Sequence, residues 1–156
     1  MRVAFTGHQN LPDSAITHLI SELDRLLATA PNLIGICSLA EGGDQVFAQA
    51  VLRSGGILDV VIPCDGYEQT FKLDGLATYF DLHSRARSVR RLNFPAPSEE
   101  AYMAAGRQIV DDAEILYACW DGEKSGGLGG TADVVEYARG VGVLVVIIWP
   151  EGVTRE

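Results

Sequence analysis

A short apolar run, ending at a turn with glycine or proline and followed by an amphipathic segment, recurs along the chain and limits its possible folds most strongly. The runs carry few polar residues, which is typical of parallel strands buried on both faces of a sheet, whereas half-buried antiparallel strands alternate polar and apolar residues. We therefore expect five strands, at residues 2–6, 33–39, 57–62, 114–120 and 143–149.

Amphipathic segments separate these runs and predict four helices, whose apolar positions lie at residues 15–27, 46–51, 102–113 and 134–138. Strands that alternate with helices form right-handed βαβ units around a parallel sheet. The length of 156 residues suits one domain. The expected fold is α/β: a doubly wound, mainly parallel sheet of about five strands flanked by helices, in a single domain over residues 1–156.

Residues 64–97 interrupt this alternation. We predict a helix from about Leu76 to Arg91, followed by a link at residues 95–97. Four of the twelve basic residues fall within seven positions of this segment: Arg85, Arg87, Arg90 and Arg91. On a helix the last three share a face, which either binds phosphate or pairs with the acidic surface of the protein.

The charge balance argues against nucleic acid as a partner. The chain has 21 Asp and Glu against 12 Lys and Arg, a net charge of −9, whereas nucleic-acid-binding domains carry a basic patch or stripe. The longest apolar run, residues 141–149, has about half the length of a membrane span. The first ten residues resemble neither a signal peptide nor a transit peptide. We expect a cytoplasmic protein that makes no contact with a membrane.

The cysteines support the same location. Cys37, Cys64 and Cys119 are far apart and show no metal-binding spacing, so we interpret them as free thiols, mostly buried, in a reducing compartment. The sequence shows no cluster of metal ligands and no Ser-His-Asp or Cys-His arrangement. We expect neither a metal site nor a cofactor.

Ligands of doubly wound sheets bind at the carboxyl ends of the strands, so the residues that follow each run are candidate site residues. The first run ends at Gly7, His8 and Gln9. A glycine lets a ligand approach the backbone, and the helix that follows offers free N–H groups to an anion. The alternative is an ordinary strand-to-helix turn with an exposed histidine.

The second run ends in a turn with two carboxylates around two glycines: Ala40, Glu41, Gly42, Gly43 and Asp44. Capping of the next helix would explain Asp44. Capping does not explain Glu41, which precedes the glycines. A carboxylate facing a nucleotide either holds ribose hydroxyls or acts as a general base.

The segment after residue 120 is the most informative. It carries Asp121 and then four glycines in five residues before Thr131: Gly126, Gly127, Gly129 and Gly130. Without Cβ atoms, successive N–H groups can converge on a phosphate, and the threonine hydroxyl can donate as well. The pattern is neither GxxxxGK[ST] nor GxGxxG. A flexible, solvent-exposed loop is the alternative.

Taken in order, five segments resemble the SLOG superfamily, the Rossmann-like group named for the DNA-uptake protein Smf/DprA and the cytokinin-activating LOG enzymes. They look like its small bacterial branch related to YspA/YpsA and like the SLOG domains found beside TIR domains. These segments are GHQNLP at 7–12, SLAEGGDQVFAQAVLRSGG at 38–56, VVIPCDGYEQTF at 60–71, AYMAAGRQIVDDAEILYACWDG at 101–122 and GGLGGTADVVEYAR at 126–139.

The resemblance implies a pocket for a nucleotide or a nucleotide derivative, with phosphate on Gly129, Gly130 and Thr131. It also implies a homo-oligomer, because SLOG relatives are commonly dimeric or larger. Two positions depart from the family pattern. Gln9 stands where this branch usually has arginine, and Val134 stands where the LOG enzymes have a glutamate, with Asp133 and Glu136 on either side.

Two functions follow. The first is a cytoplasmic sensor or binding module for a nucleotide-derived ligand, such as an ADP-ribose-like or cyclic species. The second is hydrolysis at an N-glycosidic bond, as in LOG-like phosphoribohydrolases, or transfer at that bond, as in nucleoside ribosyltransferases. There Glu41 or Asp133 would stabilise an oxocarbenium-like transition state or activate water. DNA binding fits the resemblance but not the charge.

Overall fold

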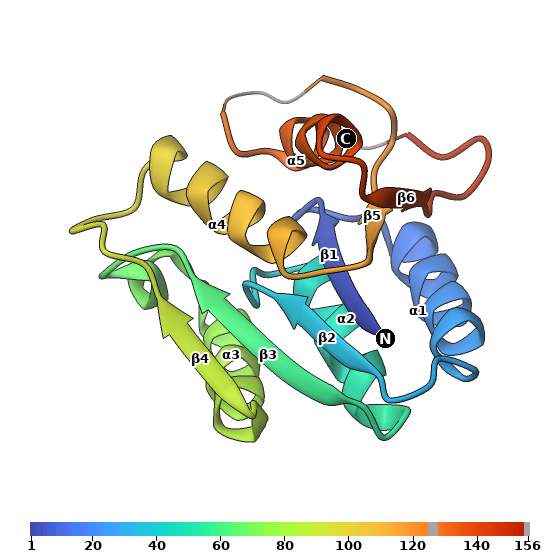
Figure 1. The fold of residues 1–156 in the computed structure, drawn as a ribbon, viewed down its shortest axis with the longest axis horizontal. Coiled ribbons are helices and arrows are strands. Elements are labelled where there is room, and N and C mark those ends of the chain that lie inside the picture. Colours follow the sequence, from blue (N-terminus) through green and yellow to red (C-terminus); the bar gives the residue numbers. More distant parts are fainter. Residues whose placement is uncertain (125–127, 155–156) are drawn as a thin grey trace.

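The computed structural model describes residues 1–124 and 128–154. These residues form a six-stranded, wholly parallel sheet with helices on both faces (Figure 1). The order of the strands is β4-β3-β2-β1-β5-β6. Their bounds are β1 Arg2–Gly7, β2 Ile34–Cys37, β3 Ile57–Ile62, β4 Ser88–Arg91, β5 Ile115–Cys119 and β6 Leu144–Ile147. The expected α/β, doubly wound parallel fold is confirmed.

The helices lie in two layers. Helices α1, α2 and α3 cover one face of the sheet, and α4 and α5 cover the other (Figure 1). Their bounds are α1 Asp13–Leu27, α2 Gly43–Arg53, α3 Leu73–Arg85, α4 Glu99–Asp111 and α5 Thr131–Gly140, and a single 3₁₀ turn, η1, spans Tyr67–Thr70. No helix among the described residues is long and apolar enough to cross a bilayer.

The connections place a switch point between β1 and β5. These two strands are paired neighbours, but the chain leaves β1 through α1 on one face and leaves β5 through α5 on the other. Loops that diverge in this way open a crevice at the carboxyl edge of the sheet, where doubly wound proteins bind their ligands.

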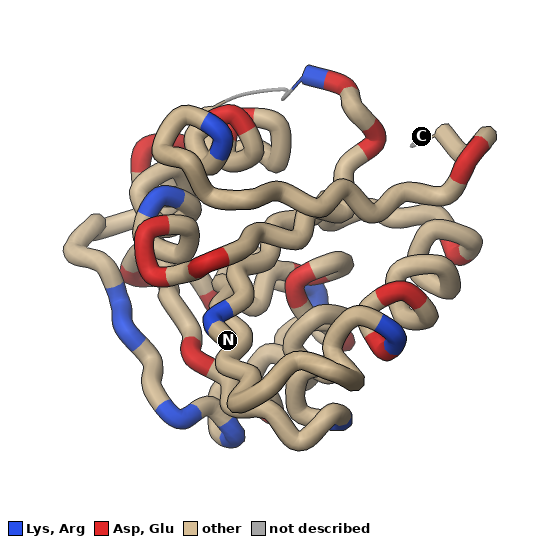
Figure 2. Tube along the Cα trace, turned by 45° about the vertical axis from the view of Figure 1, so that its right-hand side comes forward, with Lys and Arg blue, Asp and Glu red and all other residues tan. Residues whose placement is uncertain are grey.

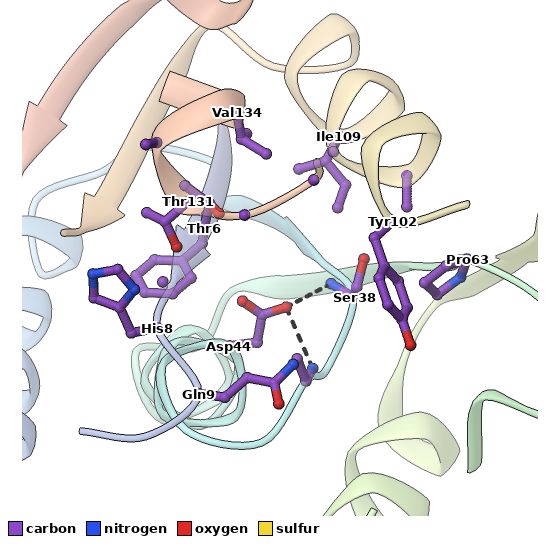
Figure 3. Close-up of a pocket in the computed structure, with 18 of the residues that line it drawn as sticks. Thr6, His8, Gln9, Ser38, Asp44, Pro63, Tyr102, Ile109, Thr131 and Val134 are labelled. Carbon is purple, nitrogen blue, oxygen red and sulfur yellow. Dashed lines mark hydrogen bonds between the residues drawn. The ribbon is translucent and has the colours of Figure 1, made fainter. Parts of the chain in front are cut away.

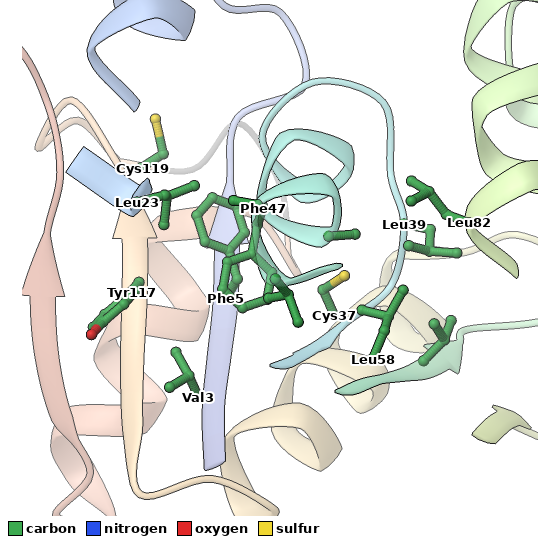
Figure 4. Packing of buried hydrophobic residues seen from close by; sticks show 14 of the residues in the cluster. Val3, Phe5, Leu23, Cys37, Leu39, Phe47, Leu58, Leu82, Tyr117 and Cys119 are labelled. Carbon is green, nitrogen blue, oxygen red and sulfur yellow. The ribbon is translucent and has the colours of Figure 1, made fainter. Parts of the chain in front are cut away.

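Packing under α2 fixes the geometry of this edge. The ring of Phe47 on α2 stacks on Phe5 of β1, with centroids 4.8 Å apart and planes inclined by 14° (Figure 4). The stack draws the start of α2 against the end of β1, where the Gly43 N–H donates to the His8 carbonyl at 3.1 Å. Gly42 has φ +84°, and a Cβ there would overlap the Gln9 carbonyl. A larger residue would therefore separate these two segments.

The sequence interpretation of residues 76–91 is wrong in its second half. Helix α3 ends at Arg85, and residues 88–91 form the edge strand β4, which makes the sheet six-stranded instead of five-stranded. Long-range contacts override the local pattern: the Arg87 guanidinium and the Ser88 hydroxyl both donate to the Asp59 carboxylate of β3, at 3.1 and 2.8 Å. The arginines therefore share no helix face.

The last apolar run also differs from expectation. It forms β6 at the opposite edge of the sheet, where Leu144 is 64% exposed and Ile147 is exposed as well. Burial on both faces is therefore wrong for this strand, although it holds for β5, whose residues are all buried. Composition alone does not distinguish a central strand from an edge strand.

Candidate functional site

A cavity of about 630 Å³ opens at the carboxyl edge of the sheet, at the switch point. The ends of β1, β2, β3 and β5 form its base, and the first turns of α2 and α5 and one side of α4 form its walls (Figure 3). All three strand-end turns that the sequence singled out contribute residues to this one cavity.

The start of α5 forms one wall. Gly130 occupies the N-cap position, and Thr131, the first helical residue, is 7% exposed. Gly129, Gly130 and Thr131 all line the cavity. The first N–H groups of a helix lack partners within it and carry partial positive charge, so this wall favours an anion. Gly126 and Gly127 lie outside the described residues.

Gly129 has a packing role that the sequence did not reveal. Its φ is +88°, and a Cβ there would lie 2.9 Å from the backbone nitrogen of Met103 on α4. Its N–H donates to Oδ2 of Asp133 at 3.0 Å. Asp133 therefore holds Gly129 in place from within α5, and it does not line the cavity.

Asp44, on the first turn of α2, presents a buried carboxyl group to the cavity. Its Oδ2 accepts hydrogen bonds from the Ser38 and Ala40 N–H groups, at 3.1 and 3.3 Å (Figure 3). Burial raises the pKa of Asp44 to about 7, against the lowering effect of these two bonds. The N-cap position of α2 is Gly42, without a side-chain cap, so Asp44 anchors the preceding loop instead of capping its helix.

His8 and Asp121 connect the ends of β1 and β5 across the switch point. His8 Nε2 lies 3.2 Å from Asp121 Oδ1, and the His8 and Trp149 rings are nearly perpendicular, with centroids 5.8 Å apart. His8 is 8% exposed, so the alternative of an exposed histidine does not hold. Both residues line the cavity.

Glu41 lies elsewhere. It lines a second cavity of about 670 Å³, together with Gly42, and its Oε1 accepts a hydrogen bond from the Lys72 N–H at 3.0 Å, at the start of α3. Gly43 is buried against the end of β1. The structure therefore brings together nine of the candidates, and it separates Glu41, Gly42, Gly43 and Asp133 from them. The nine are Gly7, His8, Gln9, Ala40, Asp44, Asp121, Gly129, Gly130 and Thr131.

The far end of the cavity is aromatic, which the sequence analysis missed. Tyr102 of α4 and Pro63 after β3 lie opposite His8 in the view of Figure 3, and Tyr67 lines the same cavity. The Tyr67 and Tyr102 rings meet at a centroid distance of 6.4 Å. Tyr102 looked like a core position of an amphipathic helix. The sequence held one sign of this wall: Pro63 directly follows a predicted strand, where ligands of doubly wound sheets bind.

The cavity is acidic in its side chains. Its described lining includes Asp44, Asp121 and Glu123 and neither lysine nor arginine. Among residues 1–124 and 128–154, no group of three His, Cys, Asp or Glu side chains is placed to hold a metal ion. With neither lysine nor arginine in this lining, any anion bound here would depend on backbone N–H groups and on polar side chains such as that of Thr131.

No family model matches the chain, and no curated protein is significantly similar to it in sequence. Its structure is similar to DNA processing protein A (DprA) from Helicobacter pylori, which binds single-stranded DNA: the TM-score is 0.68 at 14% identity over 94% of this chain and 64% of that one. DprA from Streptococcus pneumoniae is similar with a TM-score of 0.67 at 18% identity, over 94% of this chain and 49% of that one. The structural-genomics target TM1055 is similar with a TM-score of 0.60 at 16% identity, over 92% of this chain and 71% of that one.

The chain thus spans less than two thirds of either DprA chain. At these identities the likeness concerns the fold. The chain has a Rossmann-like α/β fold that it shares with DNA processing protein A.

Proposed function

We propose that the cavity at the switch point binds a small nucleotide-derived ligand, and that the protein is a cytoplasmic sensor or binding module for it. One observation carries the proposal: a helix N-terminus, a buried carboxyl group and an aromatic wall line a single cavity at the edge where doubly wound sheets bind ligands. These three features match the phosphate, ribose and base of a nucleotide.

The phosphate is assigned to the start of α5. Backbone N–H groups there and the Thr131 hydroxyl can donate to its oxygens. Without a lysine or arginine in the described lining, this wall suits one phosphate better than a run of them. The ligand class is therefore a nucleotide with few phosphates, which includes cyclic species with one and ADP-ribose-like species with two.

Ribose and base are assigned to the rest of the cavity. Asp44 uses Oδ2 for the Ser38 and Ala40 N–H groups, so Oδ1 is available to accept a hydrogen bond from a sugar hydroxyl. Tyr102 is half-buried at the aromatic end, where a ring can stack on a base.

Cleavage of an N-glycosidic bond is the second candidate, and the structure favours a different residue for it. Neither Glu41 nor Asp133 lines the cavity. Asp44 does, and a carboxyl group with a pKa of about 7 can exchange a proton at neutral pH. Asp44 is the carboxyl group that such a reaction would use.

Binding of single-stranded DNA is less favoured than a small ligand, although one structural neighbour binds it. Figure 2 shows Lys and Arg gathered along residues 85–91, whereas elsewhere on the described trace they lie among Asp and Glu. In the basic segment, Arg87 is paired with Asp59 and Arg91 with Glu68. Binding to a polyanion gains from unpaired cations that replace its counterions.

The test is proton NMR of AMP, ADP, ADP-ribose, NAD and cyclic nucleotides, each with stoichiometric protein. Broadening of base and ribose signals without new peaks supports the binding module, and new free-base peaks indicate cleavage. Thr131→Ala is expected to weaken binding about tenfold, the loss of one hydrogen bond to a charged group, whereas Thr78→Ala on α3 serves as the control. Silence across the panel, or an electrophoretic shift of single-stranded DNA at physiological salt, would overturn the proposal.

A further inference from the structure

The second cavity adjoins the first. It has a volume of about 670 Å³ and shares two lining residues, Gln9 and Asn10, with the switch-point cavity. We propose that the two cavities hold the two halves of one ligand of the dinucleotide class, in which phosphate joins a nucleoside to a second sugar or nucleoside. This inference rests on the proposed function and specifies its ligand.

Gln9 and Asn10 mark the boundary between the two cavities, because they line both. Gly42 packs so closely against Gln9 that a Cβ would overlap the Gln9 carbonyl. Gln9 and Asn10 are both exposed, so their side-chain amide groups are accessible from the cavities that they line. In the view of Figure 3, Asp44 lies between Thr131 and Gln9. A ligand with its first phosphate at Thr131 and its ribose at Asp44 therefore faces two amide groups that can donate to a linking phosphate.

Lys72 provides the charge that the first cavity lacks. Among the described residues that line either cavity, it is the one lysine or arginine. It is exposed and occupies the N-cap position of α3, so its ammonium group and the start of that helix both favour an anion. Its backbone N–H is already held by Glu41, which leaves the side chain as the group that reaches a ligand.

The remaining wall of the second cavity is apolar. Leu11 and Pro12, between β1 and α1, and Ile16, on the first turns of α1, form it, and Thr70 and Glu41 add polar groups opposite. An apolar wall with a few polar groups is the usual composition of a small-molecule site. It suits a ribose with a planar base better than a free inorganic anion, because apolar side chains offer an anion no hydrogen bonds.

The test compares AMP, which would occupy the switch-point cavity alone, with ADP-ribose and NAD, which would extend into the second cavity. Isothermal titration calorimetry is expected to give at least tenfold tighter binding for the two longer ligands. Lys72→Gln is expected to remove most of this advantage and to leave the affinity for AMP unchanged. Arg90→Gln makes the same charge change on the exposed strand β4, outside both cavities, and is the matched control.

An independent measurement locates the second half of the ligand. Nuclear Overhauser contacts are expected between the Ile16 methyl groups and the protons of the second ribose of bound NAD. If AMP binds but the longer ligands bind no tighter, or if Lys72→Gln weakens AMP equally, the inference is wrong while the proposed function stands. If neither AMP nor the longer ligands bind, both are wrong.

Discussion

Asp44→Asn is expected to stabilise the protein at neutral and alkaline pH. The carboxyl group of Asp44 is buried, and its Oδ2 accepts hydrogen bonds from the Ser38 and Ala40 N–H groups. An asparagine keeps an acceptor oxygen at the same place and has nearly the same shape. The substitution therefore removes a buried ionisable group and retains its hydrogen bonds.

The size of the effect follows from the pKa. Burial raises the pKa of Asp44 from 3.8 to about 7, so between these values the folded protein holds a proton that the unfolded chain has lost. The free energy of unfolding therefore falls as the pH rises through this window. The rise of this pKa corresponds to a loss of about 4 kcal/mol in the free energy of unfolding. The whole loss is reached once the pH exceeds the pKa of Asp44 in the folded protein. Below about pH 4 both states are protonated and the effect vanishes.

Urea unfolding of the wild type and of Asp44→Asn, from about pH 4 to about pH 8, measures this effect. The two proteins are expected to have nearly equal stability at the acid end, and the variant is expected to gain progressively toward the alkaline end. Asp65→Asn, at an exposed carboxylate after β3, is the control and should show no such trend. A stability difference that does not change with pH, or a variant less stable than the wild type at about pH 8, would refute the reasoning.

The Arg91 guanidinium lowers the pKa of Glu68 to about 2, so Glu68→Gln is expected to cost about 1 kcal/mol at pH 7 in urea unfolding, and less as the pH approaches 2. Gly35→Ala would place a Cβ 2.5 Å from Cγ2 of Val51 on α2, so it is expected to lower the free energy of unfolding by about 1–3 kcal/mol in urea unfolding. Gly140→Ala, at the end of α5 with open space, should cost nothing and gain up to about 1 kcal/mol in thermal unfolding. Leu144→Lys on the edge strand β6 should leave stability within about 0.5 kcal/mol. If two copies pair through this uncharged edge, as the expected homo-oligomer would allow, the same substitution is expected to shift sedimentation toward the monomer.

Most strands of the fold could be predicted from the sequence, because they are short runs of apolar residues, although the runs do not show which strand lies at an edge. Their runs end at glycine or proline, and the helices between them have regular apolar stripes. The strand β4 could not be predicted in this way. Its four residues, SVRR, are all exposed and follow directly on a helical segment, and its pairing with β3 depends on contacts to Asp59, which lies 28 residues earlier than Arg87. Interactions over such distances leave no local pattern.

That most of the candidate residues meet at one edge of the sheet was also predictable, but the orientation of their side chains was not. Strand-end turns had to meet at one edge of a parallel sheet. Within one such turn, however, Glu41 and Asp44 lie only three residues apart and face different cavities. The difference arises because α2 begins between them and turns Asp44 toward the sheet edge, whereas Glu41 stays in the loop beside α3.

Stability and ligand binding depend on the same carboxyl group in opposite ways. The ionised form of Asp44 destabilises the empty protein because it is buried. A ligand whose hydroxyl group donates to Oδ1 favours that ionised form, so binding lowers the pKa of Asp44 and releases a proton near neutral pH. A ribose would thus bind more tightly as the pH rises, while the empty protein becomes less stable. A ligand that presents only phosphate to Asp44 would bind more weakly over the same range, because two negative charges would meet. The pH dependence of affinity therefore distinguishes a sugar at Asp44 from an anion there.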